Sequence, residues 1–227
     1  ARLVLASAAR FEGVAASTRA GVEPELTIAI DPLVPTGPLI NSLRALSETF
    51  PNLPVHFSTE GLGGSLRRLR DGSAAFALCL LLPGVPEDIA AYPLLRVSMR
   101  AVVSPGHPLA LLGRPATEGD LAPHIQLVLS DPVDPGGASY GLAGTRHWRF
   151  VDLGRRFDFL LAGFGWCRMP EHLVATSIVA EALTAIEIHD DPTPPEGLKI
   201  YAAHRRDRAL GVAGRWLRDE LRRSLVS

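Results

Sequence analysis

The sequence has 227 residues with 23 Lys and Arg against 24 Asp and Glu, and its formal net charge of -1 lacks the basic excess of a domain that binds nucleic acid by itself. Hydrophobic residues make up 47% of the chain, which is ordinary for a soluble globular protein, and no apolar run approaches the roughly 18 residues of a membrane-spanning helix. The chain begins at Ala1, and charges interrupt its first apolar patch, so we expect a cut or processed chain without a signal peptide.

The first predicted elements are a helix, a strand, a loop and a second helix. Residues 1–20 are rich in Ala and favour a helix that Gly21 and Pro24 end. Leu26–Ile30 is typical of a strand, residues 31–37 form a turn-rich loop, and a helix begins at Pro38 with apolar residues on one face. This order places unpaired backbone amides at a strand's carboxyl end, where α/β proteins bind small or anionic ligands.

The next elements continue the alternation of strands and helices. Leu53, Val55 and Phe57 alternate as a strand, residues 62–71 indicate a helix that ends at Gly72, and residues 75–82 are a continuous apolar run typical of a buried strand. This alternation predicts a parallel sheet with right-handed crossovers. Residues 92–97 and 101–104 then follow each other as extended segments, so we expect the chain to enter a second domain there.

The second half carries a further set of predicted elements. They begin with a turn at 105–108, a short helix that starts at Asp120, a strand at 125–129 and a loop at 133–145. A helix capped by Asp152 follows, with Phe157, Leu160 and Leu161 inward, and then a turn at 165–167 and a helix opened by Pro170. Strands are predicted at 183–188 and 198–203, and the final helix carries on one face Ala213, Trp216, Leu217, Leu221 and Leu225.

Four phrases carry a resemblance to a known family. They are FPNLPV at 50–55, LRDG with AFAL at 69–78, VVSPGHPLA at 102–110 and LAGFGWCRMP at 161–170. In this order along the chain they resemble the effector-binding domain of LysR-type transcriptional regulators. The second phrase departs from the family pattern, because Ala75 and Phe76 stand where an Asp is frequent.

The resemblance implies an α/β fold of two Rossmann-like subdomains joined by two crossover strands, similar to periplasmic binding proteins of type II. The end of a linker helix is expected at 1–22, subdomain I at 24–97 and 204–227, and subdomain II at 98–203. A small-molecule effector, possibly acidic, is expected in the cleft between the subdomains, with no cofactor and no metal.

The resemblance further implies a bacterial, cytoplasmic homodimer or homotetramer, with the helix at 38–49 and the C-terminal helix as contributors to a dimer. DNA is expected to bind only through an N-terminal winged helix-turn-helix that these residues do not contain. The alternative from another class is a solute-binding protein of a transport system, which shares the architecture.

The effector contacts implied by the resemblance come from four short segments. They are Leu33, Val34, Pro35, Thr36 and Gly37; Thr59, Glu60 and Gly61; Ser130 and Asp131; and Gly163, Phe164, Gly165, Trp166 and Cys167. Either Arg149 or Arg168 is a candidate clamp for an anion. The prolines at 32, 35 and 38 stiffen the first loop and leave Thr36 as its only side-chain hydroxyl.

The sequence also contains residue types used in catalysis and in redox sensing. Ser104, His107 and Asp131 contain the residue types of a catalytic triad, but no G-x-S-x-G motif accompanies them, so no catalytic residue and no enzyme is predicted. Cys79 and Cys167 have no metal-ligand spacing, and they are expected to be buried free thiols, with a redox-sensing pair as the alternative.

Overall fold

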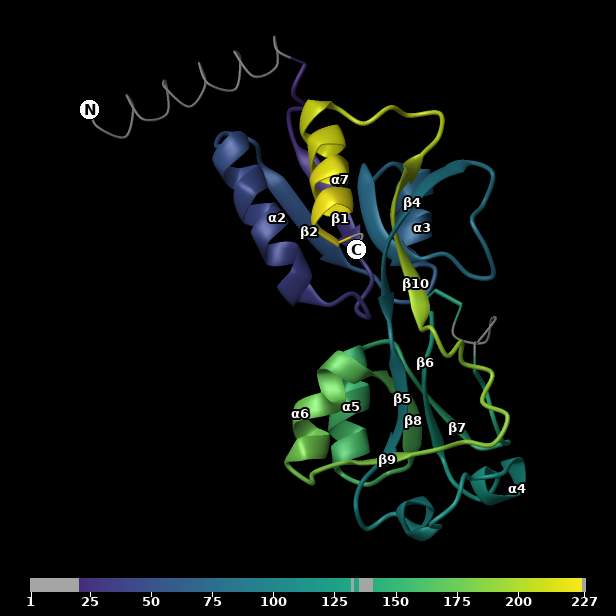
Figure 1. Cartoon of the computed structure of the whole chain (residues 1–227). Coiled ribbons are helices and arrows are strands. Elements are labelled where there is room, and N and C mark those ends of the chain that lie inside the picture. The colour runs from purple at the N-terminus through teal and green to yellow at the C-terminus, as the bar shows by residue number, and fades with distance from the viewer. Residues whose placement is uncertain (1–20, 132, 135–140, 226–227) are drawn as a thin grey trace, which may run out of the picture. The chain divides into compact units, whose positions relative to one another are not determined.

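The computed structural model describes residues 21–131, 133–134 and 141–225, and the chain divides into two compact units (Figure 1). Unit 1 takes in the described residues up to Leu95 and from Lys199 onward, and unit 2 runs from Arg96 to Leu198. Residues 1–20 of the expected linker helix lie outside the described residues.

Unit 1 is built on a five-stranded sheet with the strand order β2-β1-β3-β10-β4. β1 is parallel to both β2 and β3, as the alternation of strands and helices predicts, whereas β10 is antiparallel to β3. The elements of this unit are β1 (Leu26–Ile30), α2 (Thr36–Thr49), β2 (Val55–Thr59), α3 (Gly64–Asp71), β3 (Phe76–Leu80), β4 (Ile89–Val97), β10 (Leu198–Arg205) and α7 (Val212–Leu225).

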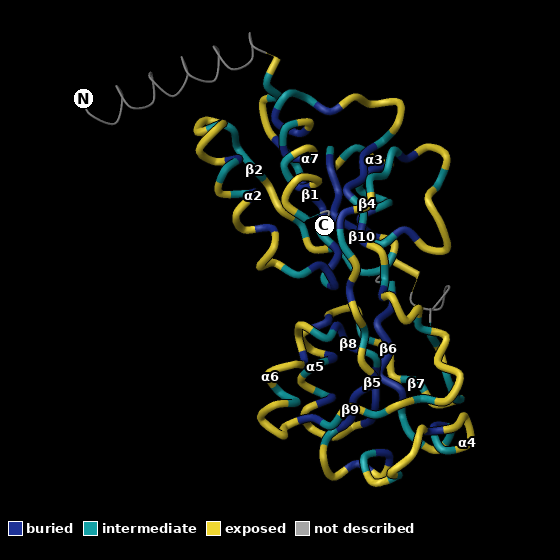
Figure 2. The backbone as a smooth tube through the Cα atoms, viewed as in Figure 1, coloured by how far each residue is buried: buried dark blue, intermediate teal, exposed yellow. Residues whose placement is uncertain are grey.

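The core of unit 1 lies on its central strands, where buried residues concentrate (Figure 2). β3 is buried along its length except at its last residue, as expected from its continuous apolar run. Phe57 differs from the expected alternation of buried residues, because β2 is the edge strand and leaves this side chain 54% exposed. Ile40 on α2 is also exposed.

Unit 2 is built on a second five-stranded sheet with the order β7-β6-β8-β5-β9. β6 is parallel to β7 and β8, and β5 is antiparallel to β8 and β9. Its elements are β5 (Met99–Val103), the 3-10 helix η1 (Pro108–Leu111), α4 (Glu118–Leu121), β6 (Gln126–Leu129), β7 (His147–Phe150), α5 (Leu153–Leu161), β8 (Trp166–Pro170), α6 (Glu171–Val179) and β9 (Thr184–Ile186).

Two elements of unit 2 differ from the sequence prediction. Residues 147–150, for which the sequence predicts no strand, form the edge strand β7, since β6 supplies a parallel partner about 20 residues earlier. The buried face of α5 is Leu153, Arg156 and Leu160, while Leu161 is exposed. A buried arginine therefore lies where an apolar side chain was expected.

The chain returns from unit 2 to unit 1 at the start of β10. The sequence division assigns residues 199–203 to subdomain II, whereas β10 pairs with β3 from Ile200 opposite Leu80 to Ala203 opposite Ala77. These residues therefore belong to unit 1.

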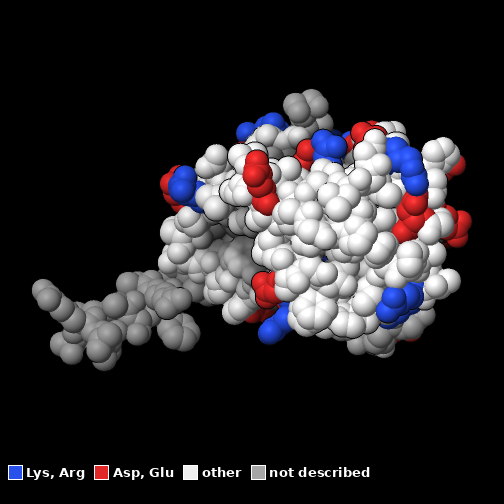
Figure 3. Space-filling view, turned by 90° about the horizontal axis from the view of Figure 1, so that it is seen from below, with Lys and Arg blue, Asp and Glu red and all other residues white. Residues whose placement is uncertain are grey.

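On the face shown in Figure 3, charged side chains lie in small groups, several of which place Lys or Arg next to Asp or Glu, around a broad area without charged residues. This face carries no continuous basic stripe of the kind that binds nucleic acid. That observation agrees with the nearly neutral composition of the chain.

Candidate functional site

The carboxyl ends of β1 and β2 meet at one edge of the unit 1 sheet. Ile30 lies opposite Thr59 in the parallel register, and the Glu60 amide donates to the Ile30 carbonyl at 3.0 Å. The structure therefore brings together two of the predicted contact segments, 33–37 and 59–61.

The loop after β1 is held by its own first residue. Asp31 is buried, its Oδ1 accepts a hydrogen bond from the Leu33 amide at 2.9 Å, and its carbonyl accepts one from the Val34 amide at 2.9 Å. The side chains of Leu33 and Val34 are buried and anchor the loop. Of the predicted contact residues in this segment, only Thr36 and Gly37 are exposed.

The N-terminus of α2 is open. The helix begins at Thr36, two residues before the predicted start, so Thr36 and Gly37 form part of its first turn. No side chain caps it, and no acidic residue lies in that turn. A Cβ atom on Gly37 would meet nothing within 4 Å. Backbone amides at such a helix end attract anions, and the Thr36 hydroxyl adds another donor.

Asp31 is the buried titratable group beside this helix end. Burial raises the pKa of its carboxyl to about 7, and the hydrogen bond from the Leu33 amide opposes that rise. Burial and the nearby Asp31 together raise the pKa of the Cys79 thiol to about 12. The interior next to the open helix end therefore holds a carboxyl that changes charge near neutral pH and a thiol that stays protonated.

The Glu60 side chain is paired within unit 1. Its carboxylate forms an ion pair with the guanidinium of Arg68 on α3. A Cβ atom on Gly64 would lie 2.8 Å from the Glu60 Cβ, so the glycine allows this side chain to pack against the start of α3. Thr59 is the exposed member of the second segment.

In unit 2, the carboxyl ends of β6 and β7 place acidic side chains at one sheet edge. Ser130 is buried, and its amide donates to the Phe150 carbonyl at 2.8 Å. Asp131 accepts from the Val133 amide at 2.8 Å. Asp152 follows β7 and caps α5 by accepting from the Arg155 amide at 2.6 Å, as the sequence predicts.

The turn at 163–165 lies at the opposite end of the unit 2 sheet. β6 and β8 are parallel, with Gln126 opposite Trp166, and the Trp166 amide donates to the Ile125 carbonyl at 3.0 Å. Ser130 lies four residues further along, roughly 13 Å at about 3.3 Å per residue. The structure therefore does not bring this turn together with Ser130 and Asp131.

The glycines of this turn have structural roles. Gly163 adopts a positive φ of 80° just after α5. A Cβ atom on Gly165 would lie 2.1 Å from the Ile125 carbonyl oxygen, so only glycine fits there. Trp166 and Cys167 are fully buried, and Phe164 is exposed beside the rings of Trp148 and Phe159.

The two predicted arginine clamps have different surroundings. Arg168 Nε lies 3.0 Å from Asp191 Oδ1, and its Nη1 donates to the Gly141 carbonyl at 2.6 Å. The guanidinium is therefore already paired with the Asp191 carboxylate. Arg149 lies on the edge strand β7 and is exposed.

Sequence reasoning missed Arg156 on α5. Its Nη2 lies 3.2 Å from the Arg168 carbonyl oxygen and 3.1 Å from Met169 Sδ. In the described part of the chain no carboxylate pairs with it, and burial lowers its pKa. An arginine in a helix ordinarily indicates a solvated surface, so no local signal marked it.

His107, one of the residues considered for a catalytic triad, has a structural role at the start of η1. It caps η1, because its Nδ1 accepts a hydrogen bond from the Leu109 amide. Burial and the neighbouring His124 lower the pKa of His107 to about 4. No group of three His, Cys, Asp or Glu gathers there to hold a metal ion. No helix in the described ranges combines the length and apolar character needed to cross a membrane.

Comparisons with solved structures show the fold. The regulatory domain of MetR from N. meningitidis is 17% identical, with a TM-score of 0.65 over 88% of this chain and 93% of that chain. The effector binding domain of QuiR, in complex with shikimate, is 16% identical, with a TM-score of 0.65 over 89% and 97%. The BenM effector binding domain with its effector benzoate is 19% identical, with a TM-score of 0.63 over 89% and 92%.

The family follows from the sequence model that matches. Comparison with curated protein sequences gives no match. The model of the LysR substrate binding domain matches residues 19–226, and the two mixed sheets agree with the periplasmic-binding-protein type II-like fold expected for it. Because this match covers nearly the whole chain, the protein belongs to the LysR substrate binding domain family.

Proposed function

We propose that this chain is the part of a LysR-type transcriptional regulator that binds a small acidic effector. The observation that carries the proposal is the uncapped N-terminus of α2, where Thr36 and Gly37 offer donors at the carboxyl end of β1. Helix amides and a hydroxyl suit a carboxylate. The effectors shikimate and benzoate, found with QuiR and BenM, are both carboxylates, which supports this ligand class.

Unit 2 supplies groups of the opposite kind. Asp131 and Asp152 are acceptors, so we assign them to hydroxyl or amino groups of an effector rather than to its carboxylate. Ser130 is buried and hydrogen-bonded to the strand end, so it positions Asp131. Neither unit is assigned a catalytic role, and the effector is expected to leave the protein chemically unchanged.

The response to the effector is a shift in conformational populations. An effector changes an equilibrium between two conformations only if it binds one of them more tightly. We propose that this shift alters DNA binding by a winged helix-turn-helix of the full-length cytoplasmic regulator. Full-length BenM structures show that a related chain carries further residues beyond such a domain.

We also propose that the chain forms a homodimer through α2. Ile40 on α2 and Phe57 on β2 are large apolar side chains that unit 1 leaves 46% and 54% exposed. Ile40→Glu is expected to lower the dimer fraction in sedimentation velocity at micromolar concentration. An unchanged sedimentation coefficient for this variant would remove α2 from the interface.

The ligand assignment is tested with small acids and matched threonine variants. Isothermal titration of a panel that includes benzoate and shikimate is expected to give a hit for the wild-type chain. Thr36→Val is expected to weaken it by about tenfold, since a hydrogen bond to a charged group contributes roughly 1.5–3 kcal/mol. Gly37→Ala keeps the amide donor and is expected to weaken binding because its Cβ would fill the open space beside the helix end that the ligand needs.

The control lies at the other end of the same helix. Thr49 is exposed, and its hydroxyl donates to the Ala45 carbonyl at 2.8 Å, away from the first turn. Thr49→Val is expected to leave the affinity unchanged. Equal affinities for all three variants and the wild type would reject the α2 N-terminus as the carboxylate site.

A further inference from the structure

The exposed face of α7 carries more guanidinium groups than nearby carboxylates can neutralise. Arg218 Nε and Nη2 lie 2.8 and 3.0 Å from the two Asp219 oxygens, and Arg223 Nη2 lies 2.6 Å from Glu220 Oε2. Arg222 has no ion pair at such a distance in the part of the chain that the structure describes. Its Cζ atom lies 5.4 Å from the centroid of the Tyr92 ring, and its charge interacts with that of Asp219.

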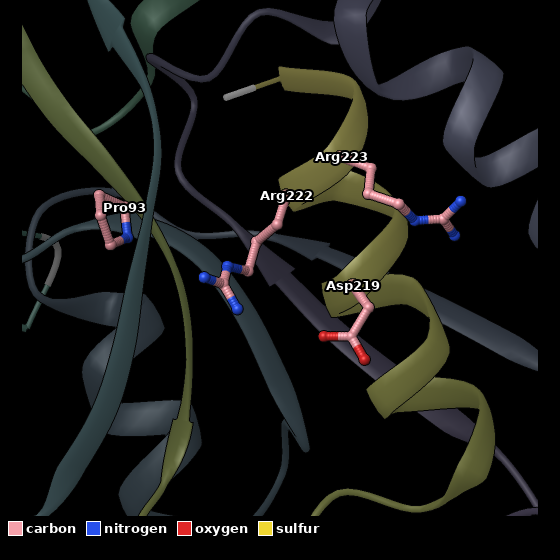
Figure 4. A pocket seen from close by; sticks show the side chains of 4 residues that line it. All are labelled: Pro93, Asp219, Arg222 and Arg223. Atoms are coloured by element: carbon pink, nitrogen blue, oxygen red, sulfur yellow. The ribbon is translucent and has the colours of Figure 1, made fainter. Parts of the chain in front are cut away.

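A pocket of about 440 Å³ lies at this face of unit 1, lined by Pro93, Asp219, Arg222 and Arg223. In Figure 4, Arg222 extends from α7 toward Pro93 on β4, Asp219 lies on the same side of the helix, and Arg223 points away from both. The volume falls in the range of roughly 300–1,000 Å³ that small-molecule sites occupy.

Tyr92 holds two positive charges close together. The guanidinium of Arg218 lies 5.1 Å from its ring and that of Arg222 lies 5.4 Å from it. The ring is itself stacked on His204, with centroids 6.0 Å apart. The two like charges repel each other, and Asp219 neutralises only one of them. Contact with the ring also restricts the conformations of Arg222, so less side-chain entropy is lost when it binds an anion.

We propose that this pocket binds a small organic carboxylate, with the Arg222 guanidinium as its bidentate donor. The Pro93 ring and the carbon chains of the arginines contact the apolar body of the ligand. A phosphate dianion is a poorer match, because one of the two arginines that line the pocket is already paired with Glu220 and Asp219 offers acceptors rather than donors. This site uses residues of β4 and α7 only, and it does not depend on the effector site proposed at α2.

The probe for the experiment is benzoate, with benzamide as an uncharged molecule of the same shape. In a ¹⁵N-labelled 227-residue chain, benzoate is expected to shift the backbone amides of β4 and α7 in a saturable way, and benzamide is not. Arg222→Gln is expected to weaken the benzoate response by about tenfold or more. Its side chain is exposed, so an unchanged melting temperature is expected to show that the variant folds.

Arg215→Gln is the matched control, because it removes the same charge from an exposed arginine of the same helix that does not line the pocket and whose guanidinium donates to the Leu210 carbonyl. Its expected effect is less than about twofold. Equal weakening by both variants would assign the response to diffuse charge on α7, and equal binding of benzamide would assign it to an apolar hollow; either result overturns the proposal. The amides of α2 report the effector site separately, so failure at one site is distinguishable from failure at the other.

Discussion

The strand ends of the two units differ in hydrogen-bonding character. In unit 1, α2 starts without a side-chain cap, and the nearby acid, Asp31, is buried with a pKa raised to about 7. In unit 2, α5 is capped by Asp152, and Asp131 bonds to the amide of its own turn. The same succession of strand, loop and helix therefore gives an anion-attracting edge in one unit and an acceptor-rich edge in the other, because the cap residue decides whether the helix amides are free.

The largest difference between the units is predicted for two glycine substitutions. Gly165→Ala places a Cβ atom 2.1 Å from the Ile125 carbonyl oxygen, and we expect it to lower the free energy of unfolding by about 4 kcal/mol or more, because the obstructing atom is backbone. Gly37→Ala in unit 1 meets open space and is expected to be neutral or slightly stabilising. Urea unfolding of both variants measures the difference, and equal stabilities would contradict the packing role of Gly165.

The raised pKa of Asp31 in unit 1 predicts that the free energy of unfolding depends on pH. Because burial raises its pKa from 3.8 to about 7, the folded state holds this proton to a higher pH than the unfolded state. Its contribution therefore lowers stability as pH rises from about 4 to about 7, and the loss is complete above that range.

Asp31→Asn removes this titration and keeps an acceptor for the Leu33 amide. At about 1.4 kcal/mol per pKa unit the full effect is at most about 4 kcal/mol, and we expect about 2 kcal/mol, because the asparagine NH₂ must also be buried. Urea unfolding is expected to show the variant more stable than the wild type at pH 8 and no more stable at pH 4. A constant difference at the two pH values would show that Asp31 does not titrate in this range.

A smaller effect is expected from opening the capped helix of unit 2. Asp152→Ala removes the acceptor of the Arg155 amide, so a loss of about 1 kcal/mol is expected in urea unfolding. Asp152→Asn keeps an acceptor oxygen and is expected to retain most of that stability. If both variants lost the same amount, the charge of Asp152 rather than its capping hydrogen bond would be responsible.

Local patterns were sufficient to predict most of unit 1 and the cap of α5. The bounds of β1, the end of α3 at Gly72 and the Asp152 cap depend on residues within one or two turns of each other. The start of α2 was predicted two residues late, because Pro38 is compatible with several positions of a first turn and lies at the third.

Features that depend on distant pairing were not accessible from local patterns. β7 becomes a strand only because β6 lies beside it, and the position of the turn at 163–165 follows from the register of Gln126 with Trp166. The phrase around Gly165 correctly indicated the family, but Gly165 is explained by packing against Ile125 and Gly163 by its positive φ. Arg156 was missed because it is buried only once α5 packs on the unit 2 sheet, where its guanidinium contacts β8.

The smallest response is expected from the two thiols, one in each unit. Cys79 on β3 and Cys167 on β8 are buried, and burial raises their pKa values to about 12 and about 11, with Arg156 opposing the rise at Cys167. Thiolates are the reactive form, so neither cysteine is expected to react with a thiol reagent or with peroxide in the folded chain, and both are expected to react in urea. Mass spectrometry of Cys79→Ser and Cys167→Ser assigns each modification to one unit. Rapid modification of either thiol without denaturant would restore the redox-sensing alternative for that unit, and modification of Cys167 alone would show that the charge of Arg156 outweighs burial.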